Sequence, residues 1–437
     1  MFVGITNSPR PYAWGSTTAI AGLLGYPASG EPEAELWLGA HAGAPATIID
    51  PAQVGGALTL ADWIAADPEQ ALGSNAVASF GARLPFLLKI LAAAGPLSLQ
   101  AHPSMRQARD GFDRENAAGL PLDAPERNYR DAFHKPELIV ALSERFEALC
   151  GFRPRDSVAQ IMAELRALDA ASDTPQVGAL DALESRLAGV GGVQAAVDWL
   201  LRDGRGGDSG EVAWLVERVV ALAEHAAYLA EGGAHIGFAV EFETVRSLAA
   251  SYPGDPGIVL SLLLNRISLT RGEALYLPAG NIHAYLSGLG IELMAASDNV
   301  LRGGLTPKHV DVDELLAVLD FTPGPVPLLM PSSRSTPGVT VYAPEIPDFE
   351  LIQIEAGTDA ALAAAAPAAP APALPVPLRQ FALTGPAIAL CTAGGFLVAG
   401  AASSVVLKRG ESVFITPDEG TLTFAGAGEV FLATVGN

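Results

Sequence analysis

Four residues in three separate stretches of the chain have the types and spacing of a single metal site. Gln100 and His102 are two residues apart, Glu137 follows a proline, and His283 follows a turn of proline, glycine and asparagine. Two imidazoles, one carboxylate and one amide oxygen suit a borderline divalent cation, with zinc as the first choice. Such a site could hold a sugar's hydroxyl and carbonyl oxygens while a proton moves between neighbouring carbons. The predicted chemistry depends on whether these four positions meet in space.

The turn before His283 has a characteristic spacing. Five residues separate Gly272 from Pro278, one residue separates Pro278 from Gly280, and two more lead to His283. This spacing resembles the second motif of the cupin superfamily, whose members are jelly-roll barrels. Pro278 and Gly280 can turn the chain between two strands, and we expect His283 then to point into the barrel.

Strand periodicity places the other ligand positions beside further polar groups. Because residues two apart in a strand lie on one face, Ser98, Gln100 and His102 share a face, and so do Lys135 and Glu137. An ammonium would then enter the same cavity as a metal ligand. Two structural interpretations remain open: a buried hydrogen-bonded pair of Gln100 and His102, and a salt bridge between Lys135 and Glu137.

The composition excludes several classes of protein. The chain has 437 residues and a formal charge of −22, and so acidic a protein is a poor partner for nucleic acid. Cys150 and Cys391 form no CxxC pattern, so we expect no disulfide framework and a cytoplasmic location. We expect no signal peptide, because the first residues lack a basic leader and an apolar core. The apolar stretch 84–97 is broken by lysine, glycine and proline, so we expect no membrane span.

The pattern along the chain predicts a mainly β protein with a helical insertion. Short apolar runs separated by glycine and proline predict strands, whereas apolar residues recur at helical spacing after residue 157. Ser157 and Gln160 have the spacing of a capping box and predict the start of the first inserted helix. We expect two cupin-like jelly-roll β-sandwich domains and an α-helical domain. Their expected ranges are 1–153 with 251–325 for a discontinuous catalytic jelly roll, 154–250 for the helical insertion, and 326–437 for a C-terminal β domain without a metal site, containing an Ala/Pro-rich loop at 357–378.

An internal repeat supports two related β domains. The segments LTRGE at 269–273 and LKRGE at 407–411 each precede an alternating strand and a turn that contains proline. The second copy has no histidine after its turn, and no histidine occurs beyond His309. Only the first copy can supply imidazole ligands, so we expect the C-terminal domain to be structural.

Longer motifs occur in a fixed order from the N-terminus nearly to residue 320. They are YAWGS at 12–16, AELWLGAH at 34–41, PLSLQAHP at 96–103, EN at 115–116, NYRD at 128–131, HKPEL at 134–138, IHAYLSG at 282–288 and DNVLRGGLTPK at 298–308. This ordered set closely resembles the type I mannose-6-phosphate isomerases (phosphomannose isomerases), whereas the C-terminal third resembles them only loosely. The resemblance implies that Gln100, His102, Glu137 and His283 bind one zinc ion per chain and that Arg302 lies in the active site.

The resemblance also implies reversible conversion of mannose 6-phosphate to fructose 6-phosphate, in which a proton leaves C2 and arrives at C1 through an enediol. Lys135 is the first candidate for proton transfer, because it flanks Glu137 on the same face. Arg302 is the candidate for charge stabilisation or for holding a polar group, unless it only pairs with Asp298. The candidates for phosphate or hydroxyl contacts are Lys89, Ser98 and Lys308. We expect a sugar phosphate as the partner and a monomer or weak oligomer.

Two other functions are compatible with the pattern. An iron-dependent cupin oxygenase commonly uses two histidines and one carboxylate, although Gln100 in place of water would be unusual there. A sugar-binding or regulatory protein could keep the fold without the chemistry, although Lys135 and Arg302 beside the ligand positions argue against it. Metal analysis with an oxygen-uptake assay tests the first alternative, and an assay for fructose 6-phosphate formation tests the second.

Overall fold

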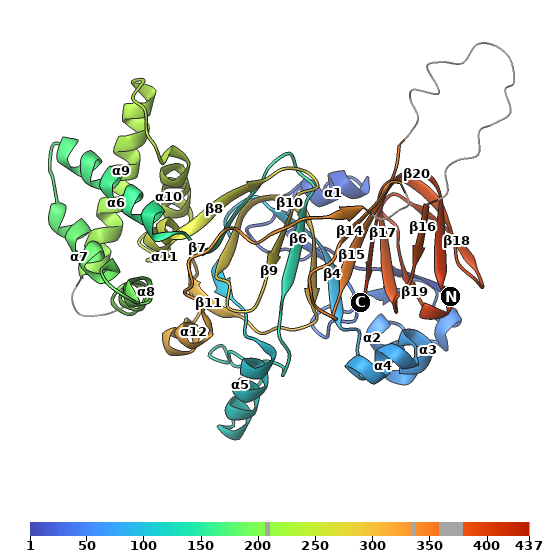
Figure 1. Cartoon of the computed structure of the whole chain (residues 1–437). Helices are drawn as coiled ribbons and strands as arrows, with labels where there is room; N and C mark the ends of the chain where they lie inside the picture. The colour runs from blue at the N-terminus through green and yellow to red at the C-terminus, as the bar shows by residue number, and fades with distance from the viewer. Residues whose placement is uncertain (206–209, 334–336, 358–378, 437) are drawn as a thin grey trace, which may run out of the picture.

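Two curved β sheets and a helical lobe make up the computed structural model of this chain, which describes residues 1–205, 210–333, 337–357 and 379–436. Each sheet has ten strands within the described residues. Figure 1 shows the first barrel in the middle, the second barrel on one side of it and the helical lobe on the other. The predicted fold class, two cupin-like β domains with a helical insertion, is confirmed.

The first barrel is organised around its longest strand, β10 (His283–Ala295). This strand pairs with β4 from Gly288 to Ala295 and with β6 from Gly290 to Met294, and its first residues pair with β5 and β7. All residues of β4 and β6 are buried, because both faces of these apolar strands are covered. The other strands of this sheet are β2 (Glu35–Leu38), β4 (Phe86–Ala93), β5 (Leu99–Ala101), β6 (Glu137–Ala141), β7 (Phe146–Phe152), β8 (Leu264–Leu269), β9 (Ala274–Leu277), β11 (Leu301–Gly304) and β12 (Leu328–Leu329).

The second barrel is built mainly by the C-terminal part of the chain, with β17 and β20 as its longest pair. Its strands are β1 (Phe2–Thr6), β3 (Thr47–Ile48), β13 (Ser332–Ser333), β14 (Val339–Tyr342), β15 (Glu350–Ala356), β16 (Arg379–Ala382), β17 (Ala387–Ala399), β18 (Ser404–Lys408), β19 (Ser412–Ile415) and β20 (Thr421–Thr434). The expected range 1–153 of the first domain thus contains two strands of the second barrel, since β1 pairs with β19 from Phe2↔Ile415 onward and β3 pairs with β1. Alternation of buried and exposed residues predicts a strand, but it does not show which sheet the strand joins. The expected Ala/Pro-rich loop at 357–378 lies, beyond its first residue, outside the described residues.

The helical lobe is inserted between β7 and β8 in the sequence and packs around one apolar core. It contains α6 (Arg155–Ala171), α7 (Val177–Leu187), α8 (Gly192–Asp203), α9 (Glu211–Glu231), α10 (Ala239–Ser251) and the short α11 (Gly257–Leu260), which is followed by the 3₁₀ turn η2 (Ser261–Leu263). The prediction that Ser157 caps the first helix is wrong, because α6 begins at Arg155 with Pro154 at its N-cap. A proline at a helix start costs no hydrogen bond, so it can open the helix three residues earlier.

Further helices lie outside the helical lobe, and the sequence pattern did not predict them. They are α1 (Ala19–Leu24), α2 (Leu60–Ala66), α3 (Pro68–Leu72), α4 (Ser74–Phe80), α5 (Met105–Ala117), α12 (Val312–Val318) and the 3₁₀ turns η1 (Pro51–Val54) and η3 (Pro417–Glu419). Capping boxes open α2 at Thr59 and α5 at Ser104. None of the helices that the structure describes combines the length and apolarity needed to cross a membrane.

Candidate active site

The ligand positions lie where several strand ends of the first barrel meet. His283 is the first residue of β10 and is aligned with Gln100 of β5. The other neighbour of Gln100 is Arg302 of β11. Glu137 is the first residue of β6 and is aligned with Met294 of β10. Three stretches that are far apart in the sequence are thereby brought together by pairing around one strand.

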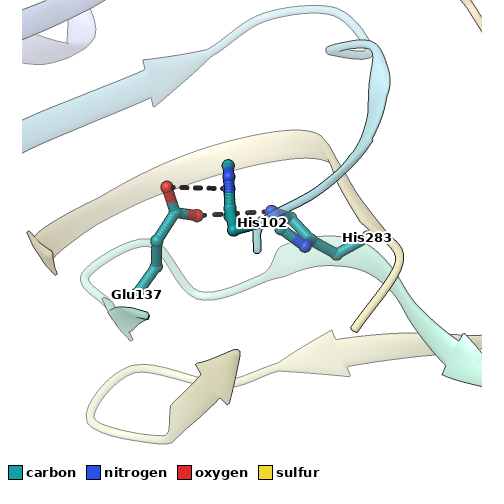
Figure 2. A group of neighbouring side chains, drawn as sticks. All are labelled: His102, Glu137 and His283. Atoms are coloured by element: carbon teal, nitrogen blue, oxygen red, sulfur yellow. Dashed lines mark ion pairs between the residues drawn. The ribbon is translucent and has the colours of Figure 1, made fainter. Parts of the chain in front are cut away.

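Two histidines face one carboxylate at this place (Figure 2). The Nε2 atom of His102 lies 3.2 Å from Oε1 of Glu137, and Nε2 of His283 lies 3.3 Å from its Oε2. One ligand atom from each of the three residues lies within 4.8 Å of the others, and all three side chains are buried. This is the compact arrangement of nitrogen and oxygen atoms that a divalent cation requires.

The hydrogen bonds of the two imidazoles determine which ring nitrogen faces the carboxylate with a lone pair. Nδ1 of His102 donates to the carbonyl of Asn299 at 2.8 Å, and Nδ1 of His283 donates to the carbonyl of Asn281 at 3.0 Å. With Nδ1 protonated, the neutral rings turn unprotonated Nε2 atoms toward the carboxylate oxygens. Both Nε2 atoms and Oε2 of Glu137 are buried without a hydrogen-bond partner. A cation between them would satisfy all three, so the residues present fit a zinc ion.

The surroundings hold His102 and Glu137 in the protonation states that bind metal. Burial lowers the pKa of His102 to about 4, with the nearby Glu137 opposing part of this shift. Burial alone would raise the pKa of Glu137, but the charge of Lys135 and the contacts with His102 and His283 lower it well below its usual value. Neutral imidazoles and an ionised carboxylate are the forms that bind a metal ion.

The two structural interpretations have different outcomes. Lys135 does form a salt bridge with Glu137, at 2.9 Å between Nζ and Oε1. Gln100 and His102 do not form the hydrogen-bonded pair, because both ring nitrogens of His102 face other groups. His134 points away from the site, as alternation predicts, and its Nε2 lies 3.0 Å from Asp348 beside β15 of the second barrel.

A cavity of about 720 Å³ opens above the buried cluster. It is lined by seven of the residues predicted for the site: Lys89, Ser98, Gln100, Lys135, Glu137, Arg302 and Lys308. The remaining two, His102 and His283, do not line the cavity themselves, but both contact Glu137, which does. The structure therefore brings all nine predicted residues to one place.

One wall of the cavity carries three cations, Arg130, Arg302 and Lys308. Burial and the neighbouring Arg130 lower the pKa of Arg302, while burial and both arginines lower the pKa of Lys308. The salt bridges found among the described residues include none of the three, and Asp298, the expected partner of Arg302, contacts His41 instead at 3.2 Å. Cations that repel one another around a cavity favour an anionic ligand.

Lys89 is in a different situation from the other lysines. It is buried and lies 2.9 Å from Glu292 and 3.7 Å from Glu35. Burial alone would lower its pKa, but Glu292 and Glu35 outweigh burial and raise it above its usual value. Lys89 lines the cavity as the cation of a buried ion pair, so its contact with a phosphate is less well supported than that of Lys308.

The sequence did not predict three charged residues that line the cavity: Arg130, Asp298 and Glu292. Burial alone would raise the pKa of Asp298, but His41 and the cations Lys135 and Arg130 lower it, so this carboxylate stays ionised. One signal was available for the basic residues. The chain has only four lysines among its 26 basic residues, and three of them line this cavity.

A buried His-Glu-His cluster on the floor of a jelly-roll barrel, below a cavity with free cations, defines a cupin-type metalloenzyme. Comparison with known proteins narrows this class. A family model described as the catalytic domain of type I phosphomannose isomerase matches residues 2–155. The mannose-6-phosphate isomerase of Salmonella typhimurium is 33% identical over 431 residues, which cover 98% of this chain and 97% of that protein. The human mannose-6-phosphate isomerase is 34% identical over 364 residues, which cover 79% of this chain and 80% of that one.

Solved structures agree with these relatives. A zinc-bound crystal structure of mannose 6-phosphate isomerase matches with a TM-score of 0.80 and 32% identity, covering 100% of both chains. The apo form from Salmonella typhimurium matches with a TM-score of 0.79. This chain belongs to the type I mannose-6-phosphate isomerase family, and the predicted family is confirmed.

Proposed function

We propose that this chain interconverts D-mannose 6-phosphate and D-fructose 6-phosphate with one zinc ion held by Gln100, His102, Glu137 and His283. One observation carries the proposal. Within the described part of the chain, Nε2 of His102, Nε2 of His283 and Oε2 of Glu137 come together without hydrogen-bond partners at the floor of a cavity, and the wall of this cavity carries cations without a salt bridge. When bound, zinc supplies orientation and charge stabilisation for the substrate's oxygens. Gln100 is the fourth ligand on this proposal, since it lies beside His283 and lines the cavity.

Arg302, Lys308 and Arg130 hold the phosphate group. A phosphate offers several oxygens to the two guanidinium groups and the ammonium, and its charge removes their mutual repulsion. Ser98 lines the same cavity and offers a hydroxyl for a sugar hydroxyl. Binding of the phosphate at this wall fixes the distance between the sugar's reacting carbons and Lys135 on the floor.

Lys135 moves the proton between C2 and C1. To act as the base, Lys135 must first give up the proton with which it pairs with Glu137 in this structure. Its amine then takes the proton from C2, the electron pair of the C–H bond forms the double bond between C1 and C2, and O1 gains a proton to complete the enediol. Return of the proton from Lys135 to C1, with loss of the O2 proton, gives the ketose. Lys135 is nine-tenths buried on the cavity side of Glu137, so water is largely excluded around it.

Asp298 is the second candidate for proton transfer, because it is an ionised carboxylate on the wall of the same cavity. Replacement of Lys135 distinguishes the two. Exchange of the C2 hydrogen with solvent at the wild-type rate in Lys135→Met would leave Asp298 as the base.

An isomerase assay with and without metal tests the proposed function. Formation of fructose 6-phosphate from mannose 6-phosphate should disappear on treatment with a chelator and return with zinc. Absence of product from the zinc-loaded protein would contradict the proposal, and metal-dependent oxygen uptake would support the oxygenase alternative. The monomeric or weakly associating state and the cytoplasmic location stay predictions.

A further inference from the structure

One loop at the cavity is held from outside the barrel, by the helical lobe. The loop follows β11, runs from Leu305 to Lys308, and lines the cavity beside Arg302. Its backbone contacts residues of two segments of the lobe: Asp255, between α10 and α11, and Arg205, just after α8. These contacts connect a region without ligand positions to the wall that we propose for the phosphate.

Asp255 accepts hydrogen bonds from both sides of this junction. Its Oδ1 atom accepts from the backbone N–H of Gly257 at 2.7 Å and from that of Leu305 at 2.9 Å. Its Oδ2 atom accepts from the N–H of Thr306 at 3.4 Å. Arg205 completes the arrangement, since its Nη2 atom lies 3.3 Å from both Oδ2 of Asp255 and the carbonyl oxygen of Thr306. One carboxylate and one guanidinium therefore hold consecutive peptide groups of the loop.

The loop has a conformation that needs such support. Leu305 has a φ of +53°, and it is the only residue other than glycine with a positive φ in the described part of the chain. A leucine adopts this conformation only where its surroundings hold it there. The two segments also approach closely, because a Cβ atom on Gly304 would lie 3.0 Å from Oδ1 of Asp255. Substitution of Gly304 would therefore disturb the same contact.

We propose that Asp255 and Arg205 are positioning residues that set the affinity for the substrate's phosphate by holding Leu305–Lys308. The inference rests on the proposed function, because it deepens the assignment of Lys308 and Arg302 to the phosphate. The left-handed turn at Leu305 directs the chain that carries Lys308 along the cavity wall. Loss of the carboxylate frees this turn, and Lys308 then spends less time beside the guanidinium of Arg302. The helical lobe thereby contributes to substrate binding without touching the substrate.

The test compares Asp255→Ala, Asp255→Asn and Arg205→Met with wild type. For Asp255→Ala we expect KM for mannose 6-phosphate to rise about tenfold or more, since all four hydrogen bonds to the carboxylate are lost, two of them from the loop. The inhibition constant of inorganic phosphate should rise in parallel, while kcat and the zinc content stay close to wild type. Asp255→Asn keeps one acceptor oxygen and should show a smaller rise, as should Arg205→Met.

A matched control lies in the same lobe. Asp169 also combines a backbone contact, to Gln176 at 3.0 Å, with a guanidinium, that of Arg218 at 2.6 Å. It does not line the cavity. Asp169→Asn should lower thermal stability and leave KM and phosphate inhibition unchanged.

The outcomes separate the two proposals. Unchanged KM and phosphate inhibition in Asp255→Asn and Arg205→Met would overturn the inference, and so would the same kinetic pattern in Asp169→Asn. If the zinc-loaded wild type forms no fructose 6-phosphate, the proposed function fails instead. Calorimetric titration with inorganic phosphate then still reports whether Asp255 sets anion affinity.

Discussion

The interiors of the two barrels differ far more than their frameworks do. The first barrel holds buried charges on strands β4, β6 and β10, among them Lys89, Glu137 and Glu292. The second barrel also buries two strand carboxylates, Glu350 and Glu429, but it has no buried lysine or histidine on its described strands, and its core cluster is apolar, with the fully buried Phe396 and Phe424. Buried charges are tolerated only where partners surround them. A jelly roll can therefore be a packed core or a reaction vessel, depending on which side chains its strands point inward.

The repeated turns show how little separates the two cases. Gly272 and Gly410 have φ values of +87° and +86°, so each turn has the left-handed residue that its RGE segment predicts. Arg271 reaches from the first barrel to Glu429 of the second at 2.6 Å, and Arg409 reaches from the second to the carbonyl of Leu23 at 2.9 Å. The turns thus tie each barrel to its neighbours. The long strand that follows begins with buried His283 in the first barrel and with exposed Thr421 in the second. The turn supplies the framework, and the residue at the strand start supplies the chemistry.

The largest expected effect comes from breaking this difference at the strand start. His283→Ala removes one of the four proposed ligands, so we expect loss of zinc together with loss of at least about 10³ in kcat/KM. Thr421→Ala, at the corresponding place in the second barrel, should change neither. Metal analysis and the isomerase assay check both variants. Full activity of metal-free His283→Ala would end the metal proposal.

The next effect distinguishes the buried lysine of the first barrel from its exposed counterpart. Lys135→Met should keep zinc and lose about 10²–10⁴ in kcat, the usual contribution of a positioned acid or base. Lys408→Met, at an exposed position of β18 in the second barrel, should keep full activity. Solvent-hydrogen exchange at C2 of the substrate gives the direct measurement. An unchanged exchange rate in Lys135→Met would remove Lys135 from the proton-transfer step.

A third prediction concerns acid stability, because only the first barrel contains buried histidines. The pKa of His102 is about 4 in the folded chain against an ordinary value of 6.5. Between these values the unfolded chain binds more protons, so the chelated protein loses stability as pH falls from 6.5 toward 4. The shift corresponds to about 3 kcal/mol in total. Urea unfolding midpoints measured at several pH values should fall less between pH 6.5 and 4 for His102→Gln than for wild type.

The matched control for this experiment is His235→Gln, at an exposed position between α9 and α10. It should follow the wild-type pH dependence. If the unfolding midpoints of His102→Gln and wild type fall equally as the pH is lowered, the fold does not hold His102 neutral. Zinc should stabilise wild type more than His102→Gln and should extend the loss of wild-type stability to lower pH, because binding keeps the imidazole unprotonated while the unfolded chain still takes up the proton.

The site was more predictable from the sequence than the fold around it. Gln100, His102, Glu137 and His283 could be grouped because their chemical types are specific and because ordered motifs surround them. Strand alternation correctly placed Lys135 beside Glu137 and His134 away from it. Arg130 and Asp298 lie within the same motifs, yet nothing in their spacing shows that both reach the cavity, because loops have no fixed period.

The fold details that were missed depend on long-range packing. β1 joins the second barrel through Val3 and Ile5, which are buried against partners more than 400 residues away in sequence. The helices α2, α3 and α4 have 7, 5 and 7 residues, too few turns for a clear helical period. The start of α6 at Arg155 followed a proline that competes with the capping box at Ser157. In each case a local signal was present, but another contact or residue decided the outcome.

The smallest expected effect separates stability from catalysis in the two cores. Phe424 of the second barrel packs edge to face on Phe396, with 6.4 Å between the ring centroids. Phe146 of the first barrel packs edge to face on Tyr285, with 5.2 Å between the ring centroids. Phe424→Leu and Phe146→Leu each lose aromatic volume from a full core, so both should cost about 1–2 kcal/mol of stability. Only Phe146→Leu should also lower kcat/KM, by a few fold. Its neighbour Tyr285 lines the cavity, and the ring centroids of Tyr285 and His283 are 6.1 Å apart. Thermal unfolding and kinetics of the zinc-loaded variants check both parts. Loss of activity in folded Phe424→Leu at the assay temperature would show that the second barrel does more than support the first.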